Sequence, residues 1–242
     1  MGKDVGKEYS FKTEIKTAIL VDGGFYRKRA NKLFGAKSPR ERAEELHKYC
    51  MSLLTDEYEK RNLYRIFYYD CPPSEKMVFH PKTRAVVNLK NSSEHNWMNE
   101  FIGELKKMRK VALRMGRLSD ETAQYQLKNA VVNKLFCKEI TVDDVVEDDF
   151  YLDVKQKGVD MRVGVDISSL VFKRQVQQII LIAGDSDFVP ASKQARREGI
   201  DFILDPMKSH INDDLFEHID GIKSATFKFQ TSKRDGKSID EE

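Results

Sequence analysis

Four aspartates stand where the pattern of the chain predicts the end of a strand or the start of a helix. Asp22 closes the apolar run at residues 17–21, and Asp185 and Asp187 follow the apolar run at residues 178–183. Asp160 comes two residues after Gly158, where a helix is expected to begin. If the two strands are parallel neighbours, their carboxyl ends share one edge of the sheet, and the helix start brings Asp160 alongside.

Clustered carboxylates repel one another, so this arrangement needs a physical reason. Two unit charges about 4 Å apart cost about 4 kcal/mol at an effective dielectric near 20. A divalent cation removes the repulsion, and carboxylate oxygens suit Mg²⁺ or Mn²⁺. Such a site performs metal-assisted phosphodiester hydrolysis well, because the ion binds a phosphate oxygen and lowers the pKa of a bound water. A structural interpretation of each aspartate, as a helix cap or a turn residue, stays open.

The elements that would position these acids alternate between apolar strands and amphipathic helices. Strands are expected at residues 17–22, 63–70, 111–116, 178–183 and 200–204. Helices are expected at residues 40–60 and 97–108, from residue 158 onward, through residues 191–195 and at residues 213–219. This alternation predicts an α/β fold in which helices cover both faces of a mostly parallel sheet.

The organisation along the chain predicts one main domain. Residues 1–16 are expected to form a flexible arm, residues 17–229 the domain, and residues 230–242 a flexible tail. Two stretches without a clean period, near 72–96 and 118–156, are expected to be inserts in the domain.

Composition limits the class of protein. The chain has 242 residues, 40% of them hydrophobic and 33% charged, which suits a folded core with a charged surface. The net charge of +3 predicts that any nucleic-acid surface is a local patch. Three widely spaced cysteines, and the absence of a signal peptide or a membrane-spanning apolar run, favour a cytoplasmic protein with reduced thiols. No nucleotide-binding P-loop, GxGxxG fingerprint or GxSxG elbow is present.

Three segments resemble the NYN domains of the LabA-like group, which belongs to the PIN-like nuclease superfamily. They read ILVDG at 19–23, QKGVDMRVGVD at 156–166 and LIAGDSDFVP at 181–190, and the resemblance covers about residues 17–225. It implies a PIN-like three-layer α/β/α sandwich, a Mg²⁺- or Mn²⁺-dependent acidic site and RNA as substrate. Carried across by motif, the catalytic and metal-binding acids are Asp22, Asp160, Asp185 and Asp187.

The resemblance also assigns Asp166 to the family's second helix acid. Six residues of helix place it about 120° around the axis and roughly 9 Å along it from Asp160. We therefore expect Asp166 to support the site from outside, paired with Lys173 or with a backbone group.

Aromatic and basic residues near the acids are candidates for substrate binding. Two aromatics and the cations beside Asp22 suit base stacking and phosphate contacts, although a buried aromatic helix face is an equal alternative. The predicted substrate-binding residues are Phe25, Tyr26, Arg27, Arg29, Lys157, Ser186, Lys193 and Arg196.

These features predict a metal-dependent endoribonuclease acting on RNA, single-stranded RNA above all, with no membrane association. The alternative is a catalytically weak NYN domain that binds RNA or a protein. One feature supports this alternative: Gly23-Gly24-Phe25 stands where many members of the family have an Asn. Cleavage of DNA or of structured RNA by the same site, and assembly into a homo-oligomer, are left open.

Overall fold

The computed structural model describes residues 14–56, 59–119, 123–184 and 186–226. Its strands are β1 (Glu14–Asp22), β2 (Lys60–Asp70), β3 (Met77–Phe79), β4 (Val86–Asn88), β5 (Val111–Met115), β6 (Arg117–Leu118), β7 (Gln124–Leu127), β8 (Phe150–Asp153), β9 (Gln156–Lys157), β10 (Gln178–Ile182), β11 (Asp201–Asp205) and β12 (Gly221–Ile222). Its α-helices are α1 (Gly23–Phe34), α2 (Pro39–Leu53), α3 (Ser93–Lys107), α4 (Asn129–Phe136), α5 (Val159–Phe172), α6 (Val189–Arg197) and α7 (Asp213–Phe216). Short 3-10 turns are η1 (Leu89–Asn91), η3 (Glu147–Asp149) and η4 (Ser186–Phe188).

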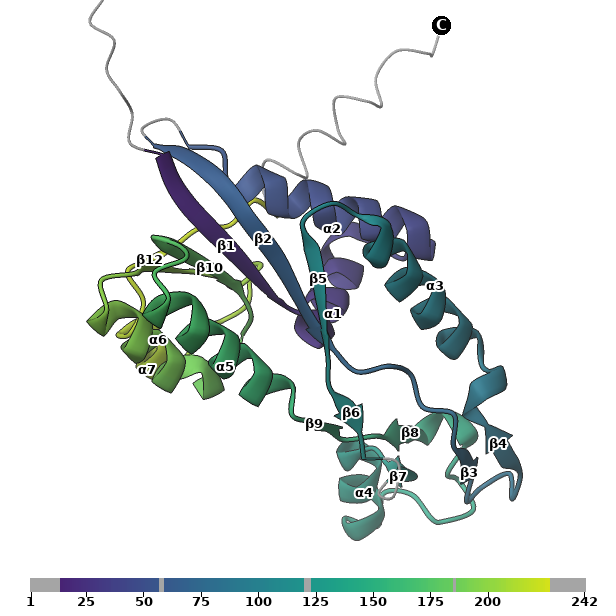
Figure 1. Ribbon diagram of the computed structural model, residues 1–242. Coiled ribbons are helices and arrows are strands. Elements are labelled where there is room, and N and C mark those ends of the chain that lie inside the picture. The colour runs from purple at the N-terminus through teal and green to yellow at the C-terminus, as the bar shows by residue number, and fades with distance from the viewer. Residues whose placement is uncertain (1–13, 57–58, 120–122, 185, 227–242) are drawn as a thin grey trace, which may run out of the picture.

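A six-stranded parallel sheet forms the centre of the molecule, in the order β12-β11-β10-β1-β2-β5 (Figure 1). The chain passes from β1 outward to β2 and β5, and then returns to β10 on the other side of β1. Because every pairing in this sheet is parallel, β1 and its two neighbours β2 and β10 end at the same edge.

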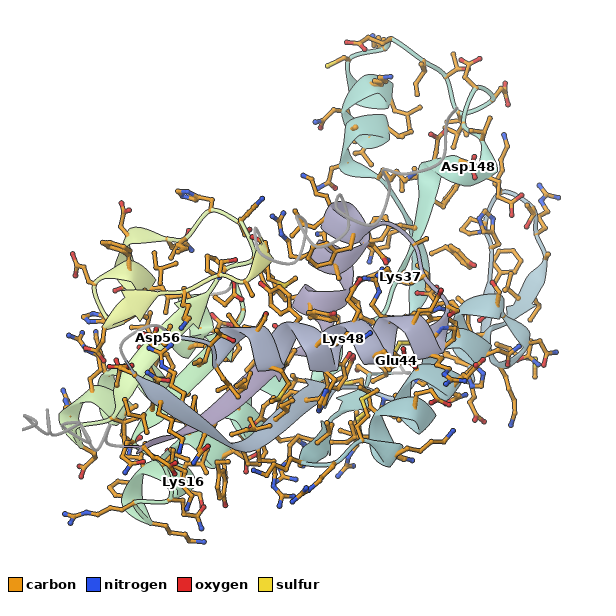
Figure 2. The ribbon with its side chains drawn as sticks, turned by 90° about the horizontal axis from the view of Figure 1, so that it is seen from above. Lys16, Lys37, Glu44, Lys48, Asp56 and Asp148 are labelled. Atoms are coloured by element: carbon orange, nitrogen blue, oxygen red, sulfur yellow. The ribbon has the colours of Figure 1, made fainter. Side chains whose placement is uncertain are left out.

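Helices cover both faces of the sheet, which confirms the predicted three-layer α/β/α sandwich. Successive residues of β1 point to opposite faces: Ala18 and Leu20 pack toward α5, α6 and α7, whereas Ile19 and Val21 pack toward α1, α2 and α3. Seen from above, α2 lies across the sheet, and its charged residues Glu44 and Lys48 are on the outer surface (Figure 2).

Several element boundaries differ from the predicted ones, and two of them illustrate why. The helix predicted at 40–60 ends at Leu53, and β1 begins at Glu14, three residues before the predicted start of the domain. The first residues of β1 and β2 are charged and exposed, and Glu14 pairs with Lys60 across the two strands. A strand end that projects beyond the core carries no hydrophobic alternation, so the sequence pattern misses it.

The two predicted inserts come together in space as one lobe. The hairpin β3–β4 comes from the first insert, and β7, α4 and β8 come from the second. Val78, Leu89 and Ala123 form a small core between them, and the His80 ring packs between Tyr125 and Phe150. This lobe lies beyond the carboxyl ends of β1, β2 and β5 (Figure 1), and Asp148 marks it in Figure 2.

No helix among the described residues is long and apolar enough to cross a membrane. The predicted flexible arm and tail lie, but for Glu14–Lys16, outside the described residues.

A buried carboxyl group, Asp205 at the end of β11, should make the stability of the fold depend on pH. Asp205 accepts hydrogen bonds from the Tyr49 hydroxyl (2.6 Å) and from the Met207 N–H (2.9 Å). Burial nevertheless raises its pKa from 3.8 to about 6. The folded state therefore binds this proton more tightly than the unfolded state, and stability rises as the pH falls from 7 to 5.

Asp205→Asn should remove this contribution, because asparagine does not ionise. We expect the free energy of unfolding of the unchanged protein to gain about 1 kcal/mol more than that of the variant between pH 7 and pH 5. Urea unfolding at both pH values measures the difference. The same pH dependence in both proteins would show that Asp205 titrates normally.

Candidate active site

Asp22 lies at the carboxyl end of β1 and caps the N-terminus of α1. Its Oδ1 accepts a hydrogen bond from the Phe25 N–H (3.0 Å), and the side chain is partly buried. Burial is the largest cause that raises the pKa of Asp22, and the negative charge of Asp160 raises it further. The hydrogen bond from Phe25 and the charge of Arg27 act in the opposite direction.

Asp160 approaches Asp22 from the other side of the sheet edge. It lies in the first turn of α5. This helix begins directly after Gly158, whose φ of 77° is in the left-handed region that favours glycine. Asp160 is exposed and acts electrostatically on both Asp22 and the Cys71 thiol. The negative charge of Asp160 thus acts on Asp22, although the two residues are far apart in the chain.

The other two predicted acids follow β10, the parallel neighbour of β1. Asp185 lies outside the described residues, and Asp187 is exposed in η4. Gly184, at the end of the described part of this segment, packs against the Phe25 ring: a Cβ at this position would lie 2.4 Å from a ring carbon. The described residues contain no group of three metal-ligating side chains, so the cluster of four acids stays a prediction.

Another acid lies at this edge of the sheet: Asp70, which is not among the predicted site residues. It ends β2, and β2 pairs with β1 so that Tyr69 lies beside Asp22. Asp70 is 1% exposed and accepts hydrogen bonds from the Tyr68 hydroxyl (2.7 Å) and the Cys71 N–H (2.8 Å). The guanidinium of Arg27 forms an ion pair with it.

The sequence contained the signal for Asp70. It closes the predicted strand 63–70 just as Asp22 closes the strand 17–22. The negative charge of Asp70 is matched by the guanidinium of Arg27, and this ion pair keeps the positive charge of Arg27 beside Asp22. The Tyr68 hydroxyl accepts a hydrogen bond from Arg27 (3.0 Å), and burial raises the pKa of Tyr68 to about 12, so this hydroxyl stays protonated at neutral pH.

Two successive glycines at the start of α1 should respond differently to substitution. A Cβ on Gly23 would lie 2.4 Å from Asp70 Oδ2 and 2.5 Å from the Tyr68 ring, whereas one on Gly24 would meet its nearest neighbour, Asp22 Oδ1, at 3.5 Å. We expect Gly23→Ala to destabilise the protein by about 1–3 kcal/mol, as overpacking does. Gly24→Ala, in ordinary contact, should be neutral or stabilising, because alanine favours a helix by up to about 1 kcal/mol.

Urea unfolding of the two alanine variants tests the close packing of Asp70 against α1. Equal stability of both variants would contradict it.

Several predicted substrate-binding residues have structural roles instead. Tyr26 is fully buried and donates a hydrogen bond to Glu45 (3.2 Å), so its predicted contact with substrate is wrong. The guanidinium of Arg29 donates to the Met207 carbonyl (2.7 and 3.1 Å) and fixes α1 to the turn after β11. The buried aromatic face of α1, the alternative considered above, is the arrangement observed for Tyr26 and Phe34.

Arg196 and Lys193 lie on α6, and the geometry does not support the prediction for Arg196. Arg196 is in the last turn, near the amino-terminal end of β11, and binds Asp220 (2.8 Å) and the Glu217 carbonyl (3.0 Å). Lys193 is exposed and lines a surface cavity with Arg196 at that far side.

The remaining candidates lie near the predicted edge. Phe25 is partly buried, Arg27 lies between Asp70 and Tyr68, and Lys157 is exposed on β9. The side chain of Ser186 is outside the described part of the structure.

Asp166 pairs with residues other than the predicted Lys173. Its Oδ2 accepts hydrogen bonds from Arg114 Nε (2.7 Å) and the Tyr69 hydroxyl (2.9 Å). Arg114 also lies over the Phe67 ring, 5.0 Å from its centroid. Asp166 therefore anchors α5 to β5 and β2.

A parallel sheet between two helical layers is the architecture expected of a PIN-like fold. The chain belongs to the NYN domain family, whose model matches residues 16–215. NYN domains are of the nuclease type, and this membership supports ribonuclease activity in general terms.

The structure is also similar to a crystal structure of a protein of unknown function from Vibrio parahaemolyticus, with 12% identity and a TM-score of 0.45. The similarity covers 89% of this chain and 94% of that one. No curated protein is significantly similar in sequence.

Proposed function

We propose that the protein is a metal-dependent endoribonuclease of the LabA-like group, with RNA as its substrate. The observation that supports the proposal is the electrostatic effect of Asp160, in the first turn of α5, on Asp22, at the carboxyl end of β1, across 138 residues of chain. Asp185 and Asp187 follow the strand that pairs with β1. Two carboxylates that each raise the cost of the other's charge fit a divalent cation, because their oxygens are the ligands that Mg²⁺ and Mn²⁺ prefer.

Asp22 and Asp160 would hold the cation, together with Asp185 and Asp187. The ion supplies Lewis acidity toward a phosphate oxygen and toward the attacking water. Hydrolysis forms a bond between the water oxygen and phosphorus and breaks the bond from phosphorus to the 3′ oxygen, which leaves a 5′-phosphate and a 3′-hydroxyl. Arg27, held by Asp70 and Tyr68, places a fixed positive charge beside Asp22.

Cleavage of single-stranded RNA in the presence of Mn²⁺ tests the proposal. The purified protein should cleave in Mn²⁺ and stop in EDTA, and Asp185→Asn should lose the activity. Equal cleavage by the unchanged protein and by Asp185→Asn would show that a contaminant is responsible.

A catalytically weak domain that binds RNA is the second candidate. Gly23-Gly24-Phe25 at the start of α1 favours it, since many members of the family have an Asn shortly after the first Asp. Thermal unfolding with and without Mn²⁺ separates the two candidates. An ion at 100 times its dissociation constant should stabilise a true metal site by about 2.7 kcal/mol, and a scaffold should show no such gain.

A further inference from the structure

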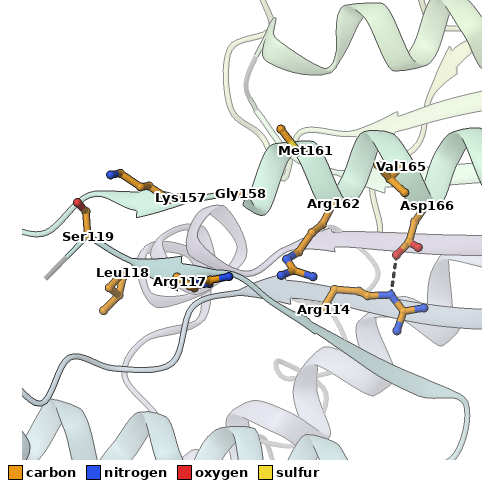
Figure 3. A pocket seen from close by; sticks show the side chains of 10 residues that line it. All are labelled: Arg114, Arg117, Leu118, Ser119, Lys157, Gly158, Met161, Arg162, Val165 and Asp166. Carbon is orange, nitrogen blue, oxygen red and sulfur yellow. Dashed lines mark hydrogen bonds and ion pairs between the residues drawn. The ribbon is translucent and has the colours of Figure 1, made fainter.

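A cavity of about 830 Å³ forms a groove between α5 and the short β6–β9 ladder, and Gly158 and Met161, the neighbours of Asp160 in the chain on either side of Val159–Asp160, line it. Arg117 of β6 pairs with Lys157 of β9 on one wall, and Arg162 projects from the first turns of α5 on the other (Figure 3). Asp160 lies in the same first turn of α5 as the lining residues Met161 and Arg162.

The lining of this groove is strongly positive. It contains the four cations Arg114, Arg117, Lys157 and Arg162, and its one carboxylate, Asp166, is bound by Arg114. Within the described part of the chain, no ion pair is formed by Arg117, Lys157 or Arg162. Three exposed cations along one groove are complementary to the phosphates of a nucleic-acid strand.

The groove also exposes apolar side chains, which favour a single strand of nucleic acid over a duplex. Met161 is 75% exposed and Val165 is 61% exposed, and they stand one turn apart on α5 next to the cations. A duplex presents phosphates and sugars while its bases stay stacked inside. A single strand can place bases against an apolar surface at the same time as its phosphates contact arginine and lysine.

We propose that this groove is the track for single-stranded RNA and leads the strand to Asp22 and Asp160. Arg117, Lys157 and Arg162 bind consecutive phosphates on one side of the cleaved bond, and Met161 and Val165 contact bases. The proposal rests on the proposed function for the identity of the ligand, but it concerns binding and is measurable without cleavage.

Fluorescence anisotropy with labelled single-stranded RNA in EDTA tests the groove. Arg117→Ala/Arg162→Ala should raise Kd at least tenfold and reduce the slope of log K against log salt by about 0.7 for each lost phosphate contact. Met161→Ala/Val165→Ala should weaken binding and leave the salt slope unchanged. The matched control is Arg109→Ala/Arg197→Ala, two exposed arginines near the amino ends of β5 and β11, which should bind as tightly as the unchanged protein.

Three results would contradict RNA binding in the groove. They are an unchanged Kd and salt slope in Arg117→Ala/Arg162→Ala, equal weakening of binding in the control, and no binding by the unchanged protein. Equally tight binding of duplex RNA would overturn the preference for a single strand. RNA binding that depends on Arg117 and Arg162, without cleavage in Mn²⁺, would leave the groove in place and contradict the nuclease activity instead.

Discussion

Asp22→Asn should lower Mn²⁺-dependent RNA cleavage by at least about 100-fold, in line with the loss of one preorganised electrostatic group. The same substitution should not lower the thermal stability of the metal-free protein. Asparagine keeps the cap on α1, because its oxygen accepts the Phe25 N–H as well as aspartate does. It also removes a partly buried charge that Asp160 repels.

The separation of activity from stability distinguishes a ligand of the metal from a structural aspartate. Asp213→Asn, an exposed position on α7, is the matched control and should change neither quantity. Cleavage assays and thermal unfolding in EDTA measure both. Full activity of Asp22→Asn would mean that Asp22 does not bind a catalytic metal, and a large drop in its melting temperature would mean that the carboxylate stabilises the fold.

Arg27→Ala should destabilise the protein by about 3 kcal/mol, because it leaves Asp70 charged, buried and unpaired. Asp70 is 1% exposed and Arg27 is its ion-pair partner. Arg27→Ala/Asp70→Asn should recover part of this loss, since the second substitution removes the unpaired charge. Urea unfolding gives the free energies, and the double-mutant cycle isolates the coupling between the two residues.

An exposed ion pair provides the comparison for this prediction. Arg40 and Glu44 pair across one turn of α2 with side chains 75% and 46% exposed. Arg40→Ala should cost no more than about 0.5 kcal/mol. Similar losses in Arg27→Ala and Arg40→Ala would show that the Arg27–Asp70 pair is solvated and does not fix the site.

Much of the sheet could be predicted from the sequence, because its inner strands are continuous apolar runs. β10 is buried at every position, as a continuous apolar run such as 178–183 requires when both faces of a parallel sheet are covered. Asp70 closes β2 as Asp22 closes β1, so the same pattern of an acid after an apolar strand marks both residues in the sequence.

The lobe, and the partners of basic side chains such as Arg29, could not be predicted in this way. The strands of the lobe are three or four residues long, too short for a hydrophobic period, and its core joins Val78 to Ala123 from separate inserts. A helical pattern places Arg29 on the surface of α1 but cannot show that its partner is a carbonyl at Met207, in a distant turn. Contacts of this kind depend on the packing of the whole chain.

A crystal soaked in Mn²⁺ and measured at a wavelength where manganese scatters anomalously tests the metal site most directly. We expect an anomalous peak bound by carboxylate oxygens of both Asp22 and Asp160. A peak that touches neither residue, or electron density in which Asp160 turns away to bind a basic side chain, would contradict the proposed metal site.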